Sequence, residues 1–484
     1  MPTSDTTLLL ADIAIARNAV EARYRIADLS FSTAIWYDSV DFDDLRARFG
    51  ADFVERLGFH IAAFEMNKVA SLKPARIDWG KYGHFADADF NRLWASIFEN
   101  VWAQWRYENR ITDYRVPELP EPAAPTAEPV ARDLPDDCYL AFCGGGKDSL
   151  LTLSLLGELG VSYDSLAYSA SFYGTAPKQH ALIDRLLDHG APRRRHKQWV
   201  SDQFLDVPVT ELRPDFGVEH ITAAETPSSI FAALPIVLAH GHRYICLAHE
   251  RSADTGQVEW NGEDINHQWG KSFAAEALLN GYIRDHLIAD FDYFSILKPV
   301  YDVTIFAALT GVEDAVPATH SCNISKPWCL ACPKCLYVWL GYAAFLDRET
   351  MIATFGDVNL LDREENIFTY RQLVGLEDQL PFECIGQARE AALFMRLAER
   401  RGWSGCAIEA CRDALDVLDL EQVASDYTAL DFDCPNIPAS IRDGLESLLE
   451  RSAAIARERI AVLSGSETPA PQSGGVYEPV HARR

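Results

Sequence analysis

The segment Tyr139–Ser149 constrains the fold of this chain more than any other. It reads YLAFCGGGKDS: an apolar run suited to a buried strand, three glycines, and polar residues that precede the helix-forming Leu150 and Leu151. Consecutive glycines permit positive φ and let a ligand approach the backbone closely. The free N–H groups at a helix start favour phosphate. The segment therefore predicts a nucleotide phosphate loop between a strand and a helix.

The loop offers several groups to a nucleotide and its metal ion. Lys147 adds a mobile positive charge, and the Asp148 carboxylate and Ser149 hydroxyl are groups that hold Mg²⁺ or cap a helix. The spacing is not that of a Walker loop. The alternative is a glycine-rich corner without a ligand, which the Lys-Asp-Ser ending disfavours. The candidate nucleotide-binding residues are Gly144, Gly145, Gly146, Lys147, Asp148 and Ser149.

The loop resembles the SGGxDS loop of the PP-loop ATP pyrophosphatases, which cleave ATP to AMP and pyrophosphate. Gly144 stands where that superfamily has serine, so one hydroxyl contact to phosphate is lost. Lys147, Asp148 and Ser149 are retained. The resemblance implies ATP as the bound nucleotide and a PP-loop (HUP-like) fold.

Residues 131–346 alternate between strand and helix patterns. Short apolar runs at 139–142, 165–169 and 244–248 are separated by helical stretches at 150–159, 179–187 and 228–240. This alternation predicts the α/β class, with a doubly wound parallel sheet covered by helices on both faces. Ligands collect at the carboxyl ends of such strands, where residues 143–149 and 249–252 both fall.

The remaining chain predicts four further regions. Polar–apolar alternation within residues 1–45 indicates strands, and residues 45–72 and 87–110 have helical periodicity. Five prolines (Pro117, Pro120, Pro122, Pro125 and Pro129) mark a linker. The predicted regions are an N-terminal α+β region (1–115), a Pro-rich linker (116–130), a mostly helical C-terminal region (347–464) and a disordered tail (465–484).

Charge and composition restrict the partners and the compartment. The net charge is −27, from 71 acidic and 44 basic residues, and such a field repels nucleic acid. The one strong basic run, residues 193–197, is interpreted as a solvated loop or an anion contact. No long apolar run or secretory signal is evident, so we expect no membrane partner. Eleven cysteines favour a reducing, cytoplasmic location. The oligomeric state stays open.

Four cysteines with the spacing C-x6-C-x2-C-x2-C predict a metal site. Four thiolates complete a tetrahedral Zn²⁺ shell, which leaves no open position and makes the metal structural. An iron–sulfur cluster is the alternative. The predicted ligands are Cys322, Cys329, Cys332 and Cys335. The other seven lack such spacing and are interpreted as buried thiols: Cys138, Cys143, Cys246, Cys384, Cys406, Cys411 and Cys434.

Two polar loops offer acids, bases and cations. Residues 249–253 (HERSA) follow the third predicted strand, and residues 263–272 (EDINHQWGKS) follow soon after. A single histidine in such a loop is more often a structural hydrogen-bonding group than a catalyst. The position of Glu250 and Arg251 at a strand end favours the functional interpretation.

The order of these segments resembles the UDP-N-acetylmuramoyl-L-alanyl-L-glutamate epimerase family. The resemblance rests on the glycine loop, residues 249–253, the run NHQWGKS at 266–272, the run YFSILKP at 293–299, and the cysteine cluster. It covers roughly residues 50–350, and residues 64–82 match more weakly. The cysteine cluster is also similar to that of the 7-cyano-7-deazaguanine synthases, which share the fold.

The family resemblance implies an ATP- and Mg²⁺-dependent inversion of the terminal L-glutamate of a nucleotide-linked muramoyl dipeptide, for peptidoglycan. The carboxylate would be adenylated, the α-proton exchanged, and AMP released. Lys147 would then neutralise developing charge and Asp148 would help to hold Mg²⁺. Glu250 and His267 are the candidates for proton transfer, and Arg251 and Lys271 for gripping a carboxylate or phosphate.

Two other functions stay open at this point. One is a PP-loop ligase or amidase, of the deazaguanine-synthase or natural-product type, that adenylates another carboxylate and requires an amine donor. The other is a non-catalytic nucleotide-binding protein that senses ATP or acts as a scaffold. Retention of Lys147, Asp148 and Ser149 argues against the second.

Overall fold

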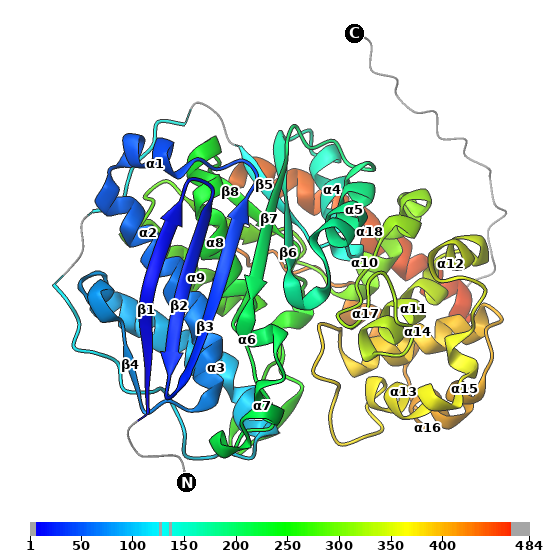
Figure 1. Cartoon of the computed structure of the whole chain (residues 1–484). Helices are drawn as coiled ribbons and strands as arrows, with labels where there is room; N and C mark the ends of the chain where they lie inside the picture. The colour runs from blue at the N-terminus through cyan, green and yellow to red at the C-terminus, as the bar shows by residue number, and fades with distance from the viewer. Residues whose placement is uncertain (1–5, 125–127, 135–137, 466–484) are drawn as a thin grey trace.

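A nine-stranded sheet forms the centre of the molecule in a computed structural model that describes residues 6–124, 128–134 and 138–465 (Figure 1). The strand order is β11-β8-β5-β6-β7-β3-β2-β1-β4, and β9 and β10 form a separate hairpin. The strands are β1 (Thr7–Ala16), β2 (Ala19–Ile26), β3 (Leu29–Tyr37), β4 (Arg76–Asp78), β5 (Tyr139–Cys143), β6 (Tyr163–Ala170), β7 (Arg195–Asp202), β8 (Tyr244–Leu247), β9 (Val258–Trp260), β10 (Glu263–Ile265) and β11 (Asp292–Ser295).

Five parallel strands form one half of this sheet. From β5 the chain adds β6 and then β7 on one side. It then crosses back to the other side of β5, where it adds β8 and finally β11. The three apolar runs predicted as strands are β5, β6 and β8. The Rossmann-like α/β prediction is confirmed, and the reversal places a topological switch point between β5 and β8.

The N-terminal strands extend the same sheet. β1, β2 and β3 form an antiparallel meander, and β3 pairs antiparallel with β7. The alternation predicted in this segment is present, since β2 buries every second residue from Val20 to Ile26. The N-terminal α+β region and the α/β region therefore share one continuous sheet.

β7 corrects the interpretation of the basic run at residues 193–197. Arg195 begins the strand instead of lying in a solvated loop, and the alternate residues His196, Gln198 and Asp202 are buried. Most of the side chains that β7 buries are polar, so its sequence lacks the alternation of apolar and polar residues that indicates a strand.

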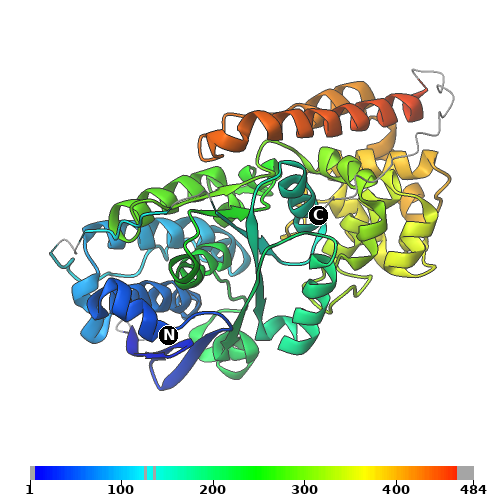
Figure 2. The same cartoon turned by 90° about the horizontal axis from the view of Figure 1, so that it is seen from above.

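Helices cover both faces of the sheet (Figure 2). Alternate residues of β5 point to opposite sides: Tyr139 and Ala141 pack with α4, α10 and α11, whereas Leu140 packs with α2, α3 and α8. The helices are α1 (Phe42–Phe49), α2 (Ala51–Met66), α3 (Ala88–Glu108), α4 (Lys147–Glu158), α5 (Ala176–Leu187), α6 (Gln203–Asp206), α7 (Val209–Leu212), α8 (Glu225–His240), α9 (Phe273–His286), α10 (Asp302–Ala308), α11 (Pro333–Phe345), α12 (Arg348–Phe355), α13 (Ile367–Leu373), α14 (Ala388–Arg400), α15 (Cys406–Ala410), α16 (Arg412–Asp416), α17 (Leu420–Thr428) and α18 (Ala439–Ser464).

The C-terminal region is helical, as predicted, and packs beside the α/β region (Figure 1). Its core is continuous with one face of the sheet, because α18 packs along α10 and α17. Among the described residues, no helix is both long and apolar enough to cross a lipid bilayer. The predicted tail lies outside the described part of the chain beyond Gly465, as does Pro125 of the linker.

Candidate active site

A cavity of about 660 Å³ opens at the carboxyl ends of β5 and β8, at the topological switch point. Gly144, Gly146, Asp148 and Ser149 line it from the glycine loop, and His249 lines it from the end of β8. Further polar walls come from the loop before α9, from residues 320–334 around the cysteine cluster and from the C-terminal region: His267, Gln268, Lys271, His320, Asn323, Lys334, Glu383 and Cys384. The structure thus brings the glycine loop and the second polar loop to one cavity.

The glycine loop has the geometry of an anion cradle. Gly145 has φ +89°, and its carbonyl accepts a hydrogen bond of 2.7 Å from the His320 N–H. A Cβ at Gly145 would overlap the His320 ring, so only glycine fits there. Gly146 is the N-cap of α4, and the Ser149 hydroxyl accepts a 3.1 Å bond from the Gly144 N–H. The loop fits a phosphate group, because the first N–H groups of a helix have no partner within the helix and residues at the start of α4, Asp148 and Ser149, line the cavity.

Lys147 is held in place, contrary to the mobile charge that the sequence predicted. Its side chain is 3% exposed, and its ammonium lies 2.6 Å from Asp148 and 2.5 Å from Asp302. Burial favours the neutral amine, but the carboxylates of Asp148, Asp302 and Glu250 raise the pKa of Lys147 above its ordinary value. In this arrangement Lys147 pairs with the carboxylates of Asp148 and Asp302 behind the loop.

Glu250 lies buried in the same group of charges. It is 6% exposed, and burial together with the negative charges of Asp302 and Asp148 raises its pKa to about 7. A carboxyl group with a pKa near the operating pH suits proton transfer. Asp148 is the carboxylate of this set that lines the cavity, which makes it the residue best placed to hold Mg²⁺.

His267 and Lys271 both line the cavity, as their predicted roles require. His267 Nδ1 lies 2.7 Å from Gln104 Oε1 on α3, which fixes its ring. The Lys271 ammonium donates to the sulfur of Cys384 at 2.7 Å. His249 is a third cavity group: burial and the charges of Lys271 and Lys298 lower its pKa well below the ordinary value, so its imidazole is neutral.

Arg251 is not brought to the glycine loop. Its guanidinium lies 3.1 Å from Asp431 and stacks over the Tyr301 ring at 4.9 Å. It lines a second cavity of about 890 Å³, together with Arg106 and Lys298. Any substrate contact through Arg251 would therefore be made in this second cavity.

The four predicted metal ligands converge. Their sulfur atoms lie within 4.8 Å of one another, with 3.9 Å between Cys322 and Cys332 and 3.8 Å between Cys329 and Cys335. A tetrahedral Zn²⁺ with bonds of 2.3 Å separates its sulfurs by about 3.8 Å, so the set fits this ion. Backbone N–H groups of Ile324, Ser325, Cys332 and Cys335 donate to these sulfurs, as expected for thiolates.

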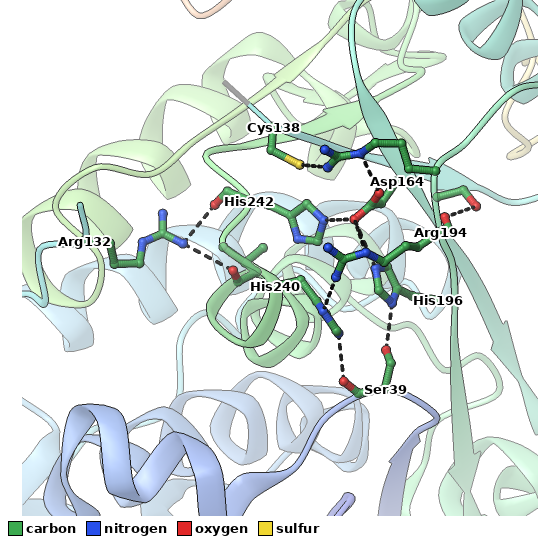
Figure 3. Close-up of polar contacts among 11 residues, drawn as sticks. Ser39, Arg132, Cys138, Asp164, Arg194, His196, His240 and His242 are labelled. Atoms are coloured by element: carbon green, nitrogen blue, oxygen red, sulfur yellow. Dashed lines mark hydrogen bonds and ion pairs between the residues drawn. The ribbon is translucent and has the colours of Figure 1, made fainter. Parts of the chain in front are cut away.

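A second polar cluster lies at the opposite ends of the strands (Figure 3). The buried Asp164 of β6 accepts from His242 at 2.8 Å, lies 3.5 Å from His196, and pairs with Arg193 at 3.2 Å. Burial would raise the pKa of Asp164, but these partners hold it well below the ordinary value. Arg193 also donates to the sulfur of Cys138, so the cluster is already neutralised by protein groups. Its role is to tie the strand starts together.

Comparison with known proteins shows which family the chain resembles. The MurL N-terminal domain model matches residues 220–296, and the MurL C-terminal domain model matches residues 318–424. The chain is therefore similar to both domains of the MurL family. The matched MurL ranges contain Glu250, His267 and Lys271, the cysteine cluster and Cys384; the glycine loop precedes both.

Three relatives are named UDP-N-acetyl-alpha-D-muramoyl-L-alanyl-L-glutamate epimerase. The protein of Micromonospora sp. is 29% identical over 64% of this chain and 68% of its own length. That of Salinispora tropica is 28% identical over 74% of this chain and 77% of its own length. That of Xanthomonas oryzae pv. oryzae is 28% identical over 66% and 70%. These MurL relatives support an epimerase function.

Two residues, one of the cavity and one of the charge group behind it, were missed in the sequence. Cys384 was interpreted as a buried thiol, but it is half-buried and lines the cavity. A single cysteine in a loop has no spacing that could indicate this. Asp302 has no motif either, since its partnership with Lys147 spans 155 positions.

Proposed function

We propose that this protein inverts the terminal L-glutamate of UDP-N-acetylmuramoyl-L-alanyl-L-glutamate in an ATP-dependent reaction that passes through an acyl-adenylate. The observation that best supports this proposal is that the glycine loop lines the same cavity as His267 and Lys271. His267 is a candidate for proton transfer, and Lys271 is a candidate for binding an anionic group of the substrate. The names of the three relatives support the substrate. The loop geometry supports ATP as the second substrate.

Activation of the carboxylate makes removal of the α-proton much easier. An α-proton next to a carboxylate is hard to remove, because the product would carry two negative charges. Attack of the carboxylate oxygen on the α-phosphorus of ATP forms a C–O–P linkage and releases pyrophosphate. The mixed anhydride lacks the carboxylate charge, so its α-proton is more acidic. Reprotonation on the opposite face and hydrolysis then release AMP and the D-glutamyl product.

Different residues of this chain are proposed to bind the nucleotide, to move protons and to bind anionic groups. The N–H groups at the start of α4 and the Ser149 hydroxyl would bind phosphate, and Asp148 would hold Mg²⁺. When bound, Mg²⁺ supplies charge neutralisation at the phosphates. Glu250 and His267 are proposed to move protons, and Lys271 to hold anionic groups. The cysteine cluster would hold a structural Zn²⁺ that fixes the loop beside the cavity.

The test is incubation of the full chain with ATP, Mg²⁺ and UDP-N-acetylmuramoyl-L-alanyl-L-glutamate in D₂O. We expect AMP, one deuterium at the glutamate α-carbon by mass spectrometry, and D-glutamate after hydrolysis and chiral analysis. AMP without deuterium would overturn the epimerase proposal and favour a ligase that needs an amine donor. Absence of AMP with this substrate would also overturn it.

A further inference from the structure

The loop that carries Cys384 crosses from the C-terminal helical region to the cavity. Three contacts fix it there: the Lys334 ammonium donates to the Cys384 carbonyl, Gln268 donates to the Ile385 carbonyl at 3.0 Å, and Asn323 donates to Glu383 at 3.0 Å. The partners come from α11, the loop before α9 and the cysteine-cluster loop. The thiol is therefore held in position on both sides of its residue.

The groups that face the Cys384 sulfur are mainly cationic. The Lys271 ammonium lies 2.7 Å from Sγ, the His267 side chain hydrogen-bonds the sulfur, and Lys334 adds its charge from α11. The opposing groups are the Glu225 carboxyl, the Glu383 carboxyl and the Tyr173 hydroxyl. The Tyr173 hydroxyl donates a 2.9 Å hydrogen bond to Glu225, which offsets part of the negative charge of the Glu225 carboxylate.

This environment favours the thiolate. Burial alone would raise the pKa of Cys384, but Lys271, the hydrogen bond with His267, and Lys334 lower it well below the ordinary value. Reactive cysteines occur in such electropositive, partly exposed surroundings, whereas structural thiols are buried among apolar groups.

We propose that Cys384 is a catalytic acid–base residue that exchanges the α-proton of the activated glutamyl group, with Lys271 as the positioning residue that keeps its sulfur ionised. The proposal rests on the proposed function. It adds a catalytic group from the C-terminal region to a site that otherwise comes from the sheet.

The proton transfer balances without any further reagent. Sγ takes the proton as the Cα–H bond breaks, an S–H bond forms, and the electron pair moves into the activated carbonyl as an enolate. Glu250 or His267 returns a proton to the opposite face, and the electron pair forms the new C–H bond. The Cys384 thiol then loses its proton to solvent, which restores the thiolate.

The first test measures the thiolate without substrate. The full chain is alkylated with iodoacetamide between about pH 6 and pH 8, and each cysteine is followed by peptide mass spectrometry. We expect the rate at Cys384 to change little over this range, whereas an ordinary thiol gains about tenfold per pH unit. Lys271→Gln should restore the ordinary slope. An ordinary slope at Cys384 in the wild type would overturn the proposal.

The second test separates proton exchange from adenylation. Cys384→Ala should retain substrate-dependent exchange of labelled pyrophosphate into ATP, and should lose α-deuterium incorporation by about 10²-fold or more. Cys406→Ala is the matched control, because that half-buried thiol donates to the Leu361 carbonyl in the C-terminal region. Undiminished deuterium incorporation in Cys384→Ala would overturn the acid–base role. If the wild type forms no AMP, the proposed function fails and the catalytic role with it, while the alkylation result still reports on the thiolate.

Discussion

The ammonium of Lys147 lies 2.5 Å from the carboxylate of Asp302, although 155 positions separate the two residues in the chain. Lys147 is the first residue of α4, and Asp302 is the first residue of α10. Both side chains are buried, so the pair connects the glycine loop to the helical layer behind it. The position of the loop therefore depends on a contact outside the glycine motif.

Breaking this pair should destabilise the protein. In Asp302→Asn the Lys147 charge keeps only Asp148 as a close partner, and removing one member of a buried pair costs about 3–5 kcal/mol. Urea unfolding should show this loss in the free energy of unfolding, whereas the exposed Asp52→Asn on α2 should change it little. An unchanged free energy in Asp302→Asn would contradict the assignment of the pair.

Adjacent glycines of the loop should respond differently to alanine. Gly145→Ala forces a Cβ into the His320 ring at φ +89°, whereas a Cβ at Gly144 meets nothing within 4 Å. We expect Gly145→Ala to weaken ATP binding by about tenfold or more, since strain of this kind costs about 1–3 kcal/mol. Gly144→Ala should bind almost as the wild type does. Calorimetric titration with ATP measures both, and equal affinities would argue against the cradle.

Removing the metal should loosen the cavity wall. We expect one Zn²⁺ per chain by elemental mass spectrometry, and Cys329→Ser should lose it. Lys334 lies inside the cluster and holds the Cys384 carbonyl, so hydrogen exchange should rise in residues 379–386 after chelation. Iron and acid-labile sulfide in the purified protein would instead favour the iron–sulfur alternative.

Activity should follow the protonation of Glu250. Burial and the nearby carboxylates raise its pKa to about 7, and returning a proton requires the protonated carboxyl, so this role predicts a rate of deuterium incorporation that falls as the pH rises through this value. Glu250→Gln should lower the rate by about 10²-fold or more and remove this limb of the profile. A profile that keeps the limb in Glu250→Gln would assign it to another group.

Stability should fall in mild acid because of His60. This buried side chain contacts the Arg56 carbonyl at 2.8 Å and the Tyr282 hydroxyl at 2.7 Å, and burial lowers its pKa from 6.5 to about 3. Below pH 6.5 the His60 side chain is protonated in the unfolded chain but stays neutral in the folded chain. The free energy of unfolding should therefore drop by up to about 1.4 kcal/mol per pH unit as the pH falls toward 3.

The check is the slope of unfolding free energy against pH in wild type and His60→Gln. The variant should be less stable at neutral pH but lose less stability between pH 6.5 and 4. The exposed His84→Gln should keep the wild-type slope. An identical slope in His60→Gln would show that other groups dominate the acid response.

The accuracy of the strand predictions depended on what each strand buries. β5, β6 and β8 bury apolar side chains on both faces, so a short apolar run indicated each of them. β7 buries His196, Gln198 and Asp202, and its polar sequence resembled a loop. Partners on other strands explain this inward polarity in part, because His196 lies beside Asp164 of β6 and Asp202 accepts a hydrogen bond from Thr33 of β3.

The sequence alone predicted the features that depend on neighbouring residues. The conformation of the glycine loop depends on six neighbouring residues, and the convergence of the four cysteines depends on their spacing within fourteen positions, so short-range sequence carries both. The tertiary structure alone decided that Lys147 pairs with Asp302, that Arg251 lies in a second cavity, and that Cys384 meets Lys271. These contacts join segments far apart in the chain, such as the 155 positions between Lys147 and Asp302, and their geometry follows from how helices and loops pack on the sheet. No local pattern encodes that packing, because it is set by the burial of the whole core.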